Sequence, residues 1–376
     1  MKAAVLGAGM MGSVISRDLA KAGDFDTVVV ADTDEKRLRN VERFAGRKVI
    51  GEILDVRNTE RTARFVASFD VVASALPHGI VHLANIACVK AGAKMVDIAF
   101  EDRQIELHQE ALKSGALLIP GCGLAPGLGG ILLANGSREI SGREGRILVG
   151  GLPQTPEEPF RYRLLFSIVG LAREYIEEAR IVRDGKVLKV RPFDKIMRFK
   201  FPKPIGELEG FYTDGLATLL YTMKHMENMS EITLRWPGHA EKFKFLIEAG
   251  FFERKEIEFD GNAISPYDFT LAFLEKKLSQ GDNRDMTVMK VEVKGTKGQL
   301  VYFLIDFYDE KDRITSMART TGYTCSIVAR FVASEAIKGK GVLTPEEAIK
   351  GRLFKELLKE LKTRSINIKK YKKSKL

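Results

Sequence analysis

The stretch MKAAVLGAGMMGSVISRDLAKAGDFDTVVVAD, residues 1–32, decides the fold of this chain. Its first apolar residues predict a short buried strand, and GAGMMG at 7–12 follows as a GxGxxG loop. Apolar residues then recur at helical spacing until Gly23, a residue type that commonly ends a helix. A β-branched run at 27–30 predicts a second strand, which ends beside Asp32. This order predicts a doubly wound α/β domain at the start of the chain.

Each glycine of the loop has a separate physical role. Gly7 permits the tight turn, Gly9 lets the backbone approach a pyrophosphate, and Gly12 lets the helix pack closely on the strand. The free N–H groups of the helix N-terminus then face the phosphates. Asp32 follows at about 20 residues, the spacing at which a carboxylate accepts the ribose hydroxyls of NAD. The alternative is a glycine loop that serves only helix–strand packing.

The acid also bears on the choice of cofactor. A 2′-phosphate would be repelled by Asp32, so the sequence predicts NAD, with NADP as a weaker alternative. Lys36 and Arg37 either soften this preference or are solvated side chains of the next helix.

Later strand ends complete the predicted cofactor site. The run 49–55 ends at Asp55 and Val56, a position that often meets the adenine ring in this type of fold, and the run 70–77 ends in small residues before a turn at His78. The predicted cofactor-binding residues are Gly7, Gly9, Met10, Met11, Gly12, Asp32, Asp55, Val56, Ser74, Ala75, Leu76 and His78.

The composition narrows the class of protein. A length of 376 residues predicts two or three domains. Much of the net charge of +10 lies in residues 361–376, which we expect to be a solvated basic tail, so we expect no specific nucleic-acid binding. The chain contains no apolar run of 18 residues and no signal-peptide pattern, which predicts no membrane segment and a cytoplasmic location. Cys88, Cys122 and Cys325 form no CxxC pair, so we expect reduced thiols and no metal site.

The alternation of strand and helix stops near Gly142. The glycine–proline loop at 120–130 is either a second ligand edge or the turn out of the first domain. Beyond it, predicted strands follow one another in pairs, with Asp184-Gly185 as a hairpin turn and a further strand at 164–166. This predicts a second, α+β domain at about 125–317 with a largely antiparallel sheet.

Three polar residues are candidate catalytic groups. Asp97 ends an apolar strand, where a carboxylate is costly to bury without a partner, so it faces the ligand or caps the next helix. His239 follows a strand in RWPGHAEK and is either a structural histidine or a general base. Arg319, in MARTT, has the guanidinium suited to binding an amino-acid carboxylate. The predicted substrate-binding residues are Asp97, Cys122, Tyr162, Tyr212, Thr213, His239, Arg319 and Thr320.

Several blocks together resemble the saccharopine dehydrogenase-like family. They are GAGMMG, the loop GCGLAPG at 121–127, VGGLP at 149–153 and RYRLLFS at 161–167. RWPGHAEK at 235–242 and MARTTGYT at 317–324 look closest to the L-lysine 6-dehydrogenases within that family.

The resemblance implies a Rossmann domain completed by C-terminal helices, with the second domain inserted. The expected domains are therefore 1–124 plus 318–360 for NAD, 125–317 for substrate and dimerisation, and the tail 361–376. It also implies a homodimer joined through the inserted sheets and a role in lysine catabolism. The reaction would be oxidative deamination of the ε-amine of L-lysine with NAD, giving ammonia and 2-aminoadipate 6-semialdehyde, which cyclises to 1-piperideine-6-carboxylate.

A mechanism follows as a hypothesis. The amine must lose a proton before hydride leaves the adjacent carbon, and Asp97 or His239 is the candidate base. Arg319 would hold the substrate carboxylate. The alternatives are a saccharopine-type dehydrogenase, a reductive polyamine-forming enzyme, and a non-catalytic NAD-binding regulator.

Overall fold

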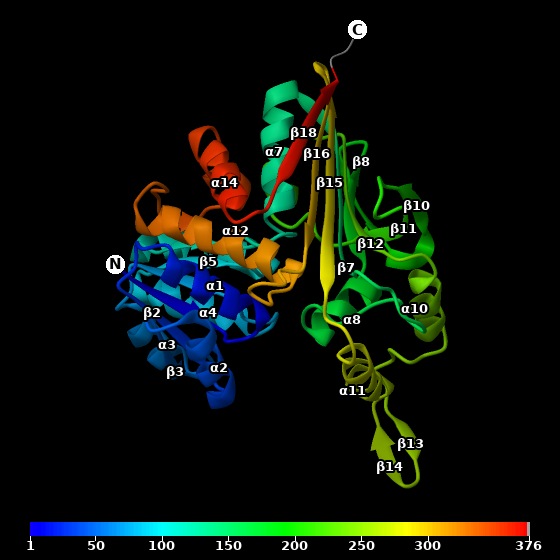
Figure 1. The fold of residues 1–376 in the computed structure, drawn as a ribbon, viewed down its shortest axis with the longest axis horizontal. Helices are drawn as coiled ribbons and strands as arrows, with labels where there is room; N and C mark the ends of the chain where they lie inside the picture. The colour runs from blue at the N-terminus through cyan, green and yellow to red at the C-terminus, as the bar shows by residue number, and fades with distance from the viewer. Residues whose placement is uncertain (374–376) are drawn as a thin grey trace. The chain divides into compact units, whose positions relative to one another are not determined.

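The computed structural model describes residues 1–373, which form two compact units (Figure 1). Unit 1 contains Met1–Glu139, Ala217–Lys224 and Ala318–Ile368. Unit 2 contains Ile140–Leu216, His225–Met317 and the C-terminal residues from Lys369.

Unit 1 is built on a seven-stranded sheet in the order β17-β6-β5-β4-β1-β2-β3, and all its strand pairs are parallel. The winding reverses between β1 and β4, which makes their carboxyl ends the topological switch point where ligands bind in such sheets. This confirms the predicted Rossmann-type α/β domain. The strands are β1 (Lys2–Leu6), β2 (Thr27–Asp32), β3 (Val49–Ile53), β4 (Val71–Ser74), β5 (Lys94–Asp97), β6 (Leu117–Ile119) and β17 (Gly341–Val342).

Helices from both ends of the chain cover this sheet. The side chain of Asp18 on α1 joins them, because its carboxylate accepts hydrogen bonds from Ser326 Oγ on α12 at 2.5 Å and from Arg364 Nε at 2.7 Å. C-terminal helices therefore complete the domain, as expected from the resemblance. The helices of unit 1 are α1 (Met10–Lys21), α2 (Glu35–Ala45), α3 (Thr59–Val66), α4 (Val81–Ala91), α5 (Asp102–Glu106), α6 (His108–Ser114), α7 (Leu128–Ile140), α9 (Leu219–Thr222), α12 (Ser316–Ala333), α13 (Pro345–Ala348) and α14 (Arg352–Thr363).

The domain boundaries differ from the expected ones. The chain leaves unit 1 at Ile140 and not near 125, because α7 is held there by Asn135 Nδ2, which donates to the carbonyl of Ile349 at 2.9 Å. The glycine–proline loop is therefore the turn into α7. The segment Ala217–Lys224, expected in the second domain, belongs to unit 1.

The basic tail expected at 361–376 is ordered where it is described, although most of its side chains are exposed, as expected for a solvated segment. Residues 361–368 belong to unit 1, where Leu361 is fully buried, and β18 (Ile368–Lys373) joins the sheet of unit 2 beside β16. The rest of the predicted tail, 374–376, lies outside the described residues.

Unit 2 is built on a nine-stranded sheet. Its main path is β10-β11-β12-β7-β15-β16-β18, with the β8–β9 hairpin paired to β12. The pair β12–β7 is parallel, whereas β10–β11, β11–β12, β7–β15 and β15–β16 are antiparallel, which confirms the largely antiparallel sheet. The strands are β7 (Gly142–Pro153), β8 (Ala179–Arg183), β9 (Lys186–Val190), β10 (Met197–Lys200), β11 (Glu207–Thr213), β12 (Asn228–Arg235), β15 (Asp285–Gly295) and β16 (Gly298–Phe307).

Local predictions in unit 2 have mixed outcomes. The turn Asp184-Gly185 joins β8 to β9 with φ of 50° and 73°, as a hairpin turn requires. The predicted strand at 164–166 is wrong, because this segment is irregular and leads into α8 (Ile168–Ile176). Its apolar residues pack instead with α10 (His239–Glu248) and α11 (Pro266–Leu278) in an aromatic core.

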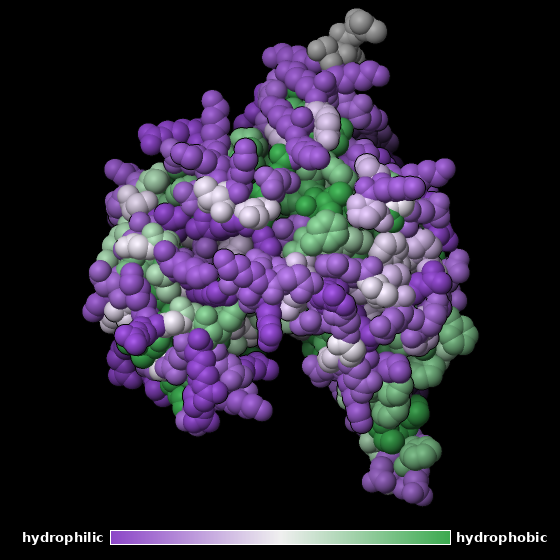
Figure 2. All heavy atoms as spheres, in the orientation of Figure 1, coloured by the Kyte–Doolittle hydropathy of each residue, from purple (hydrophilic) through white to green (hydrophobic). Residues whose placement is uncertain are grey.

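Apolar side chains also gather on the surface of unit 2. Phe269 and Phe273 on α11 stack at 6.4 Å between ring centroids, and Phe259 on the small hairpin β13–β14 (Ile257–Phe259 and Asn262–Ile264) is 66% exposed. Figure 2 shows hydrophobic atoms over this helix and hairpin. Exposed patches of this kind mark interaction surfaces; the homodimer stays a prediction. In the described part of the chain, the helices are too short or too polar to cross a membrane.

The first turn of α10 depends on a carboxylate from the neighbouring strand. Glu209 on β11 is fully buried and accepts hydrogen bonds from the backbone N–H groups of Gly238 at 2.8 Å and Ala240 at 2.6 Å. It supplies the cap that the helix lacks locally.

The substitution Glu209→Ala should therefore lower the free energy of unfolding by about 2–5 kcal/mol, because two N–H groups lose their acceptor. Glu207 on the same strand is the matched control, since its carboxylate and its partner Arg198 are both about half exposed. Glu207→Ala should change the free energy of unfolding by less than about 0.5 kcal/mol. Urea denaturation measures both, and equal losses for the two variants would contradict the capping role.

Candidate functional site

The strand register brings the chemical groups of unit 1 to one edge of the sheet. Leu6 at the end of β1 pairs with Ala31 on β2 and with Ser74 on β4. Ser74 in turn pairs with Asp97 on β5. Because neighbouring strands lie about 4.8 Å apart, the glycine loop after β1 and Asp97 are about 10 Å apart at backbone level. These carboxyl ends form the candidate cofactor site.

The glycine loop is held by two close backbone approaches. Gly7 has φ of +98°, and a Cβ there would lie 2.8 Å from the carbonyl oxygen of Ala75. A Cβ on Gly12 would lie 1.8 Å from the carbonyl oxygen of Gly7. Both glycines are therefore required by the fold of the loop itself, in agreement with the turn and packing roles predicted for them.

Gly9 differs, because it is required by nothing within the protein. A Cβ on Gly9 would meet no protein atom within 4 Å, and φ is −74°. Gly9 is also the N-cap of α1, and no side chain caps this end of the helix. The open space and the uncapped N–H groups fit the pyrophosphate of a dinucleotide. Met10, next to it, is 47% exposed.

Asp32 is fixed at the expected place beside this loop. Its Oδ2 accepts a hydrogen bond from the N–H of Ala8 at 2.7 Å, and its Oδ1 accepts one from the N–H of Asp34 at 2.9 Å. Asp34 caps α2 and lies 3.5 Å from the guanidinium of Arg37. Arg37, the first arginine of α2, is therefore paired with a carboxylate.

The predicted adenine-side residues have mixed outcomes. Asp55 accepts hydrogen bonds from Arg57 Nε on both carboxylate oxygens at 2.9 Å, at the surface. Val56 is 7% exposed and its side chain packs in the apolar core of unit 1, so a cofactor contact through its backbone stays a prediction. Ser74 is fully buried below the site, and Leu76 packs at the margin of the same core.

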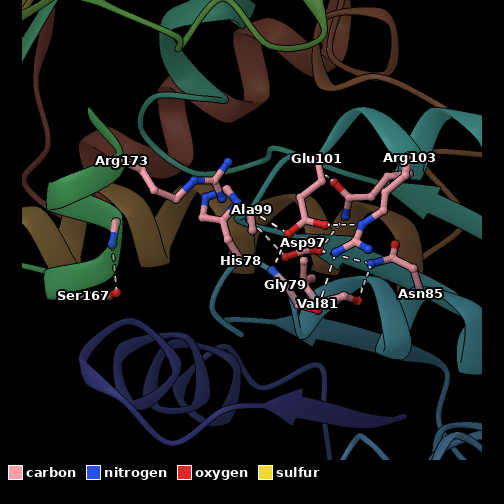
Figure 3. Close-up of polar contacts among 12 residues, drawn as sticks. His78, Gly79, Val81, Asn85, Asp97, Ala99, Glu101, Arg103, Ser167 and Arg173 are labelled. Carbon is pink, nitrogen blue, oxygen red and sulfur yellow. Dashed lines mark hydrogen bonds and ion pairs between the residues drawn. The ribbon is translucent and has the colours of Figure 1, made fainter. Parts of the chain in front are cut away.

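Asp97 is the buried carboxylate at this edge (Figure 3). Its Oδ1 accepts a hydrogen bond from the N–H of Ala99 at 3.0 Å. Its Oδ2 accepts hydrogen bonds from Gln104 Nε2 at 2.9 Å and from Asn85 Nδ2 at 3.5 Å. All three groups are donors, so the surroundings suit the ionised carboxylate.

Burial opposes ionisation and dominates. Desolvation raises the pKa of Asp97 to about 7, although the hydrogen bonds to Ala99, Asn85 and Gln104 act in the opposite direction. A carboxylate with a pKa near neutrality is suited to accepting a proton from a substrate at the same pH. Perturbed carboxylates of this kind are typical of functional sites.

The loop after β4 is fixed by Glu101, the residue that precedes α5. The carboxylate of Glu101 accepts a hydrogen bond from the N–H of Gly79 and lies 3.7 Å from Nδ1 of His78 (Figure 3). Arg103 Nε donates to the other oxygen at 2.6 Å. His78 therefore lies at the edge of the candidate site, where a cofactor contact was predicted, and that contact stays a prediction.

His239 lies in the core of unit 2, and the geometry argues against the predicted general base. The side chain is fully buried, its Nδ1 is 2.7 Å from the carbonyl oxygen of Phe160, and its Nε2 is 2.8 Å from the hydroxyl of Tyr175. Both ring nitrogens are therefore engaged. Burial, followed by the charge of Arg235, lowers the pKa of His239 to about 3. We assign His239 a structural role.

Arg319 is also more buried than predicted. It is 6% exposed, and its Nη2 donates to the carbonyl of Arg364 at 2.9 Å within unit 1. This contact ties α12 to the segment after α14, which favours a structural role over an open carboxylate site. Thr320, the next residue, is fully buried.

The other predicted substrate contacts do not share one surface. Tyr212 lines a shallow pocket with Arg146 and Ser230, whereas Thr213 is buried and lies 2.9 Å from the hydroxyl of Thr233. Adjacent residues of a strand point to opposite faces, so Tyr212 and Thr213 do not face the same surface.

Tyr162 and Cys122 are both buried. Tyr162 is 3% exposed in unit 2, under the guanidinium of Arg235 at 4.7 Å from the ring centroid. Cys122 is fully buried in unit 1, where its N–H donates to the carbonyl of Asp97 at 2.7 Å. Burial raises the pKa of the Cys122 thiol. Substrate contacts at Tyr162 and Cys122 stay predictions.

Two residues that hold Asp97 were missed in the sequence. Gln104 carried a usable signal, because Glu101 and Gln104 have the spacing of a helix capping box, which the structure contains. Asn85 carried none, since it lies within an apolar helix and its place beside Asp97 depends on tertiary packing.

The glycine loop can be tested by comparing two substitutions. Gly9→Ala should leave the free energy of unfolding within about 1 kcal/mol of wild type but weaken NADH binding at least about tenfold, because the added methyl group occupies the phosphate space. Gly12→Ala should lower the thermal stability of the protein itself, because its Cβ collides with Gly7. NADH fluorescence titration and thermal denaturation measure the two effects. Unchanged NADH affinity in Gly9→Ala would contradict this placement of the pyrophosphate.

Comparisons with known proteins agree with this geometry. The model of the saccharopine dehydrogenase NADP binding domain matches residues 3–119, and that of the saccharopine dehydrogenase C-terminal domain matches 123–366. The crystal structure of apo saccharopine dehydrogenase (L-Glu forming) from Saccharomyces cerevisiae has a TM-score of 0.81 at 22% identity, covering 99% of this chain and 100% of that one. It shares the fold.

Curated relatives are distant in sequence. Saccharopine dehydrogenase [NADP(+), L-glutamate-forming] of Schizosaccharomyces pombe is 21% identical, covering 95% of this chain and 96% of that protein. Carboxyaminopropylagmatine dehydrogenase of Synechocystis is 23% identical, covering 92% of each. Alpha-aminoadipic semialdehyde synthase of Arabidopsis thaliana is 22% identical over 78% of this chain, which spans only 36% of that protein. With both family models matched in order over almost its whole length, the chain belongs to the saccharopine dehydrogenase family of pyridine-nucleotide-dependent oxidoreductases.

Proposed function

We propose that this chain is an NAD-dependent dehydrogenase that oxidises a carbon–nitrogen bond, with the ε-amine of L-lysine as the first candidate substrate. The observation that carries the proposal is Asp97, a buried carboxylate held by three N–H donors at the carboxyl edge of the sheet. It lies two strands from the glycine loop, in the register row that the fold imposes.

The chemistry needs a proton acceptor at this place. A primary amine is an ammonium ion at neutral pH, and it must lose a proton before the adjacent carbon gives up a hydride. Asp97 accepts that proton in its ionised form, which predominates above its pKa of about 7. A nicotinamide cofactor, when bound, supplies the hydride acceptor. Water then adds to the oxidised carbon, and ammonia leaves.

The choice of lysine rests on the resemblance of two sequence blocks, 235–242 and 317–324, and not on a described pocket. A saccharopine-type substrate is supported to the same degree, because the yeast relatives carry that name. An amine of the polyamine type is supported by the Synechocystis relative. A non-catalytic regulator would bind the nucleotide without turnover.

Initial rates of NADH formation separate these possibilities. With NAD, we expect L-lysine to give turnover, and saccharopine and ornithine to give less. Asp97→Asn should lower kcat at least about 100-fold, because general-base assistance typically contributes about 10²–10⁴ in rate. In wild type, kcat/KM should fall as the pH drops below about 7, since protonated Asp97 accepts no proton.

The control is NADH affinity, which should stay unchanged in Asp97→Asn. Turnover with saccharopine alone would select the saccharopine-type reading. Silence of wild type with all three amines, at any pH from 6 to 10, would exclude the lysine proposal.

The cofactor preference follows from the charges beside the ribose position. Asp32 and Asp34 are two carboxylates at the end of β2, and Arg37 is paired with Asp34. A 2′-phosphate there meets negative charge, which favours NAD. The name of the matched NADP binding domain and that of the S. pombe relative point the other way.

Asp32→Ser should therefore raise the KM for NAD about tenfold or more and narrow the preference of kcat/KM for NAD over NADP. Asp32→Asn is the matched variant, since its side-chain oxygen can still accept from Ala8 while the charge is gone. It should keep more NAD affinity than Asp32→Ser. Wild type that prefers NADP over NAD would contradict this assignment.

A further inference from the structure

The amide of Gln104 has a fixed orientation. Its Oε1 accepts a hydrogen bond from the backbone N–H of Glu101 at 2.7 Å, so the NH₂ group must face the other way. That NH₂ group donates to Oδ2 of Asp97 at 2.9 Å. Gln104 is fully buried, and a rotated amide would place an acceptor against the carboxylate. Gln104 therefore presents only N–H to Asp97.

The same residue belongs to the cap of α5. Glu101 is the N-cap and Gln104 occupies the third helical position, the arrangement of a capping box. Glu101 also accepts from the N–H of Gly79, in the loop after β4 (Figure 3). The helix start thus links that loop to the carboxylate through Glu101 and Gln104.

Asn85 is a weaker partner of the same carboxylate. Its Nδ2 donates to the carbonyl of Val81 at 2.7 Å and lies 3.5 Å from Oδ2 of Asp97. Of the two side-chain amides that donate to Asp97, Gln104 makes the shorter bond and has its direction set by a second contact.

We propose that Gln104 is a positioning residue, which holds Asp97 ionised and oriented so that it can accept the proton of the substrate amine. The inference rests on the proposed function, in which Asp97 is that acceptor. Gln104 acts through Asp97 and is not itself assigned a contact with substrate.

The three thiols near Asp97 stay protonated in the relevant pH range. Three thiols interact electrostatically with Asp97: those of Cys88 on α4, Cys122 after β6 and Cys325 on α12. Burial raises the pKa of all three thiols above the usual value. Of these four groups, Asp97 is therefore the one that titrates near neutral pH.

The test measures the titration of Asp97 directly, by ¹³C NMR of the carboxyl carbons in the apo protein, with Asp97→Asn to identify the resonance. Gln104→Met removes the donor at similar size, and the midpoint should rise by about one to two pH units. Gln104→Glu replaces the donor with a second carboxyl group. The two carboxyl groups then titrate as a pair, and the midpoint of Asp97 should lie at a still higher pH than in Gln104→Met. Gln109→Met, at an exposed position on α6, should leave the midpoint unchanged.

The same variants give a second reading in turnover. In Gln104→Met, the acid limb of the pH profile of kcat/KM should shift to higher pH by the same amount as the NMR midpoint. On the alkaline plateau, kcat should stay within about threefold of wild type. A purely structural role would lower the plateau without moving the limb. Midpoints unchanged in both Gln104 variants would overturn the proposal. If wild type turned over no amine, the proposed function would fail, yet the NMR midpoint would still report whether Gln104 holds Asp97.

Discussion

The register of three neighbouring strand pairs is the constraint on which the candidate site depends. Leu6 pairs with Ala31 and Ser74, and Ser74 pairs with Asp97, so four strands end in one row. The loop after the first of them, Asp32 beside it and Asp97 two strands away must then share the same edge. A slip of one residue in any pair would turn these side chains to the opposite face.

Buried carboxylates have different roles in the two units. Glu209 in unit 2 is buried against two helix N–H groups and serves as a cap. Asp285, also in unit 2, accepts from the N–H groups of Ser316 and Met317 and caps the start of α12 in the same way. Asp97 is held by two side-chain amides and one N–H group at a ligand-binding edge. Asp97 differs from these two structural carboxylates in its position at the ligand-binding edge. The strand register sets that position.

Sequence reasoning succeeded where the signal was local. The glycine loop, Asp32 and Asp97 follow from residues that are close in the chain to a strand end, and the structure places them as expected. The two readings of His239 stayed open because its burial and its contacts with Phe160 and Tyr175, the latter 64 positions away, depend on tertiary packing. The spacing of Glu101 and Gln104 indicated the helix start, but the contact between Gln104 and Asp97 depends on how α5 packs.

In the proposed reaction, Asp97 accepts the proton of the substrate amine at the carboxyl edge of the sheet. A crystal structure of the protein with reduced cofactor and the amine substrate tests it most directly. We expect a carboxylate oxygen of Asp97 at about 2.6–3.2 Å from the substrate nitrogen. An amine nitrogen held by another side chain, with Asp97 beyond hydrogen-bond distance and still bound only to Gln104, Asn85 and Ala99, would contradict it.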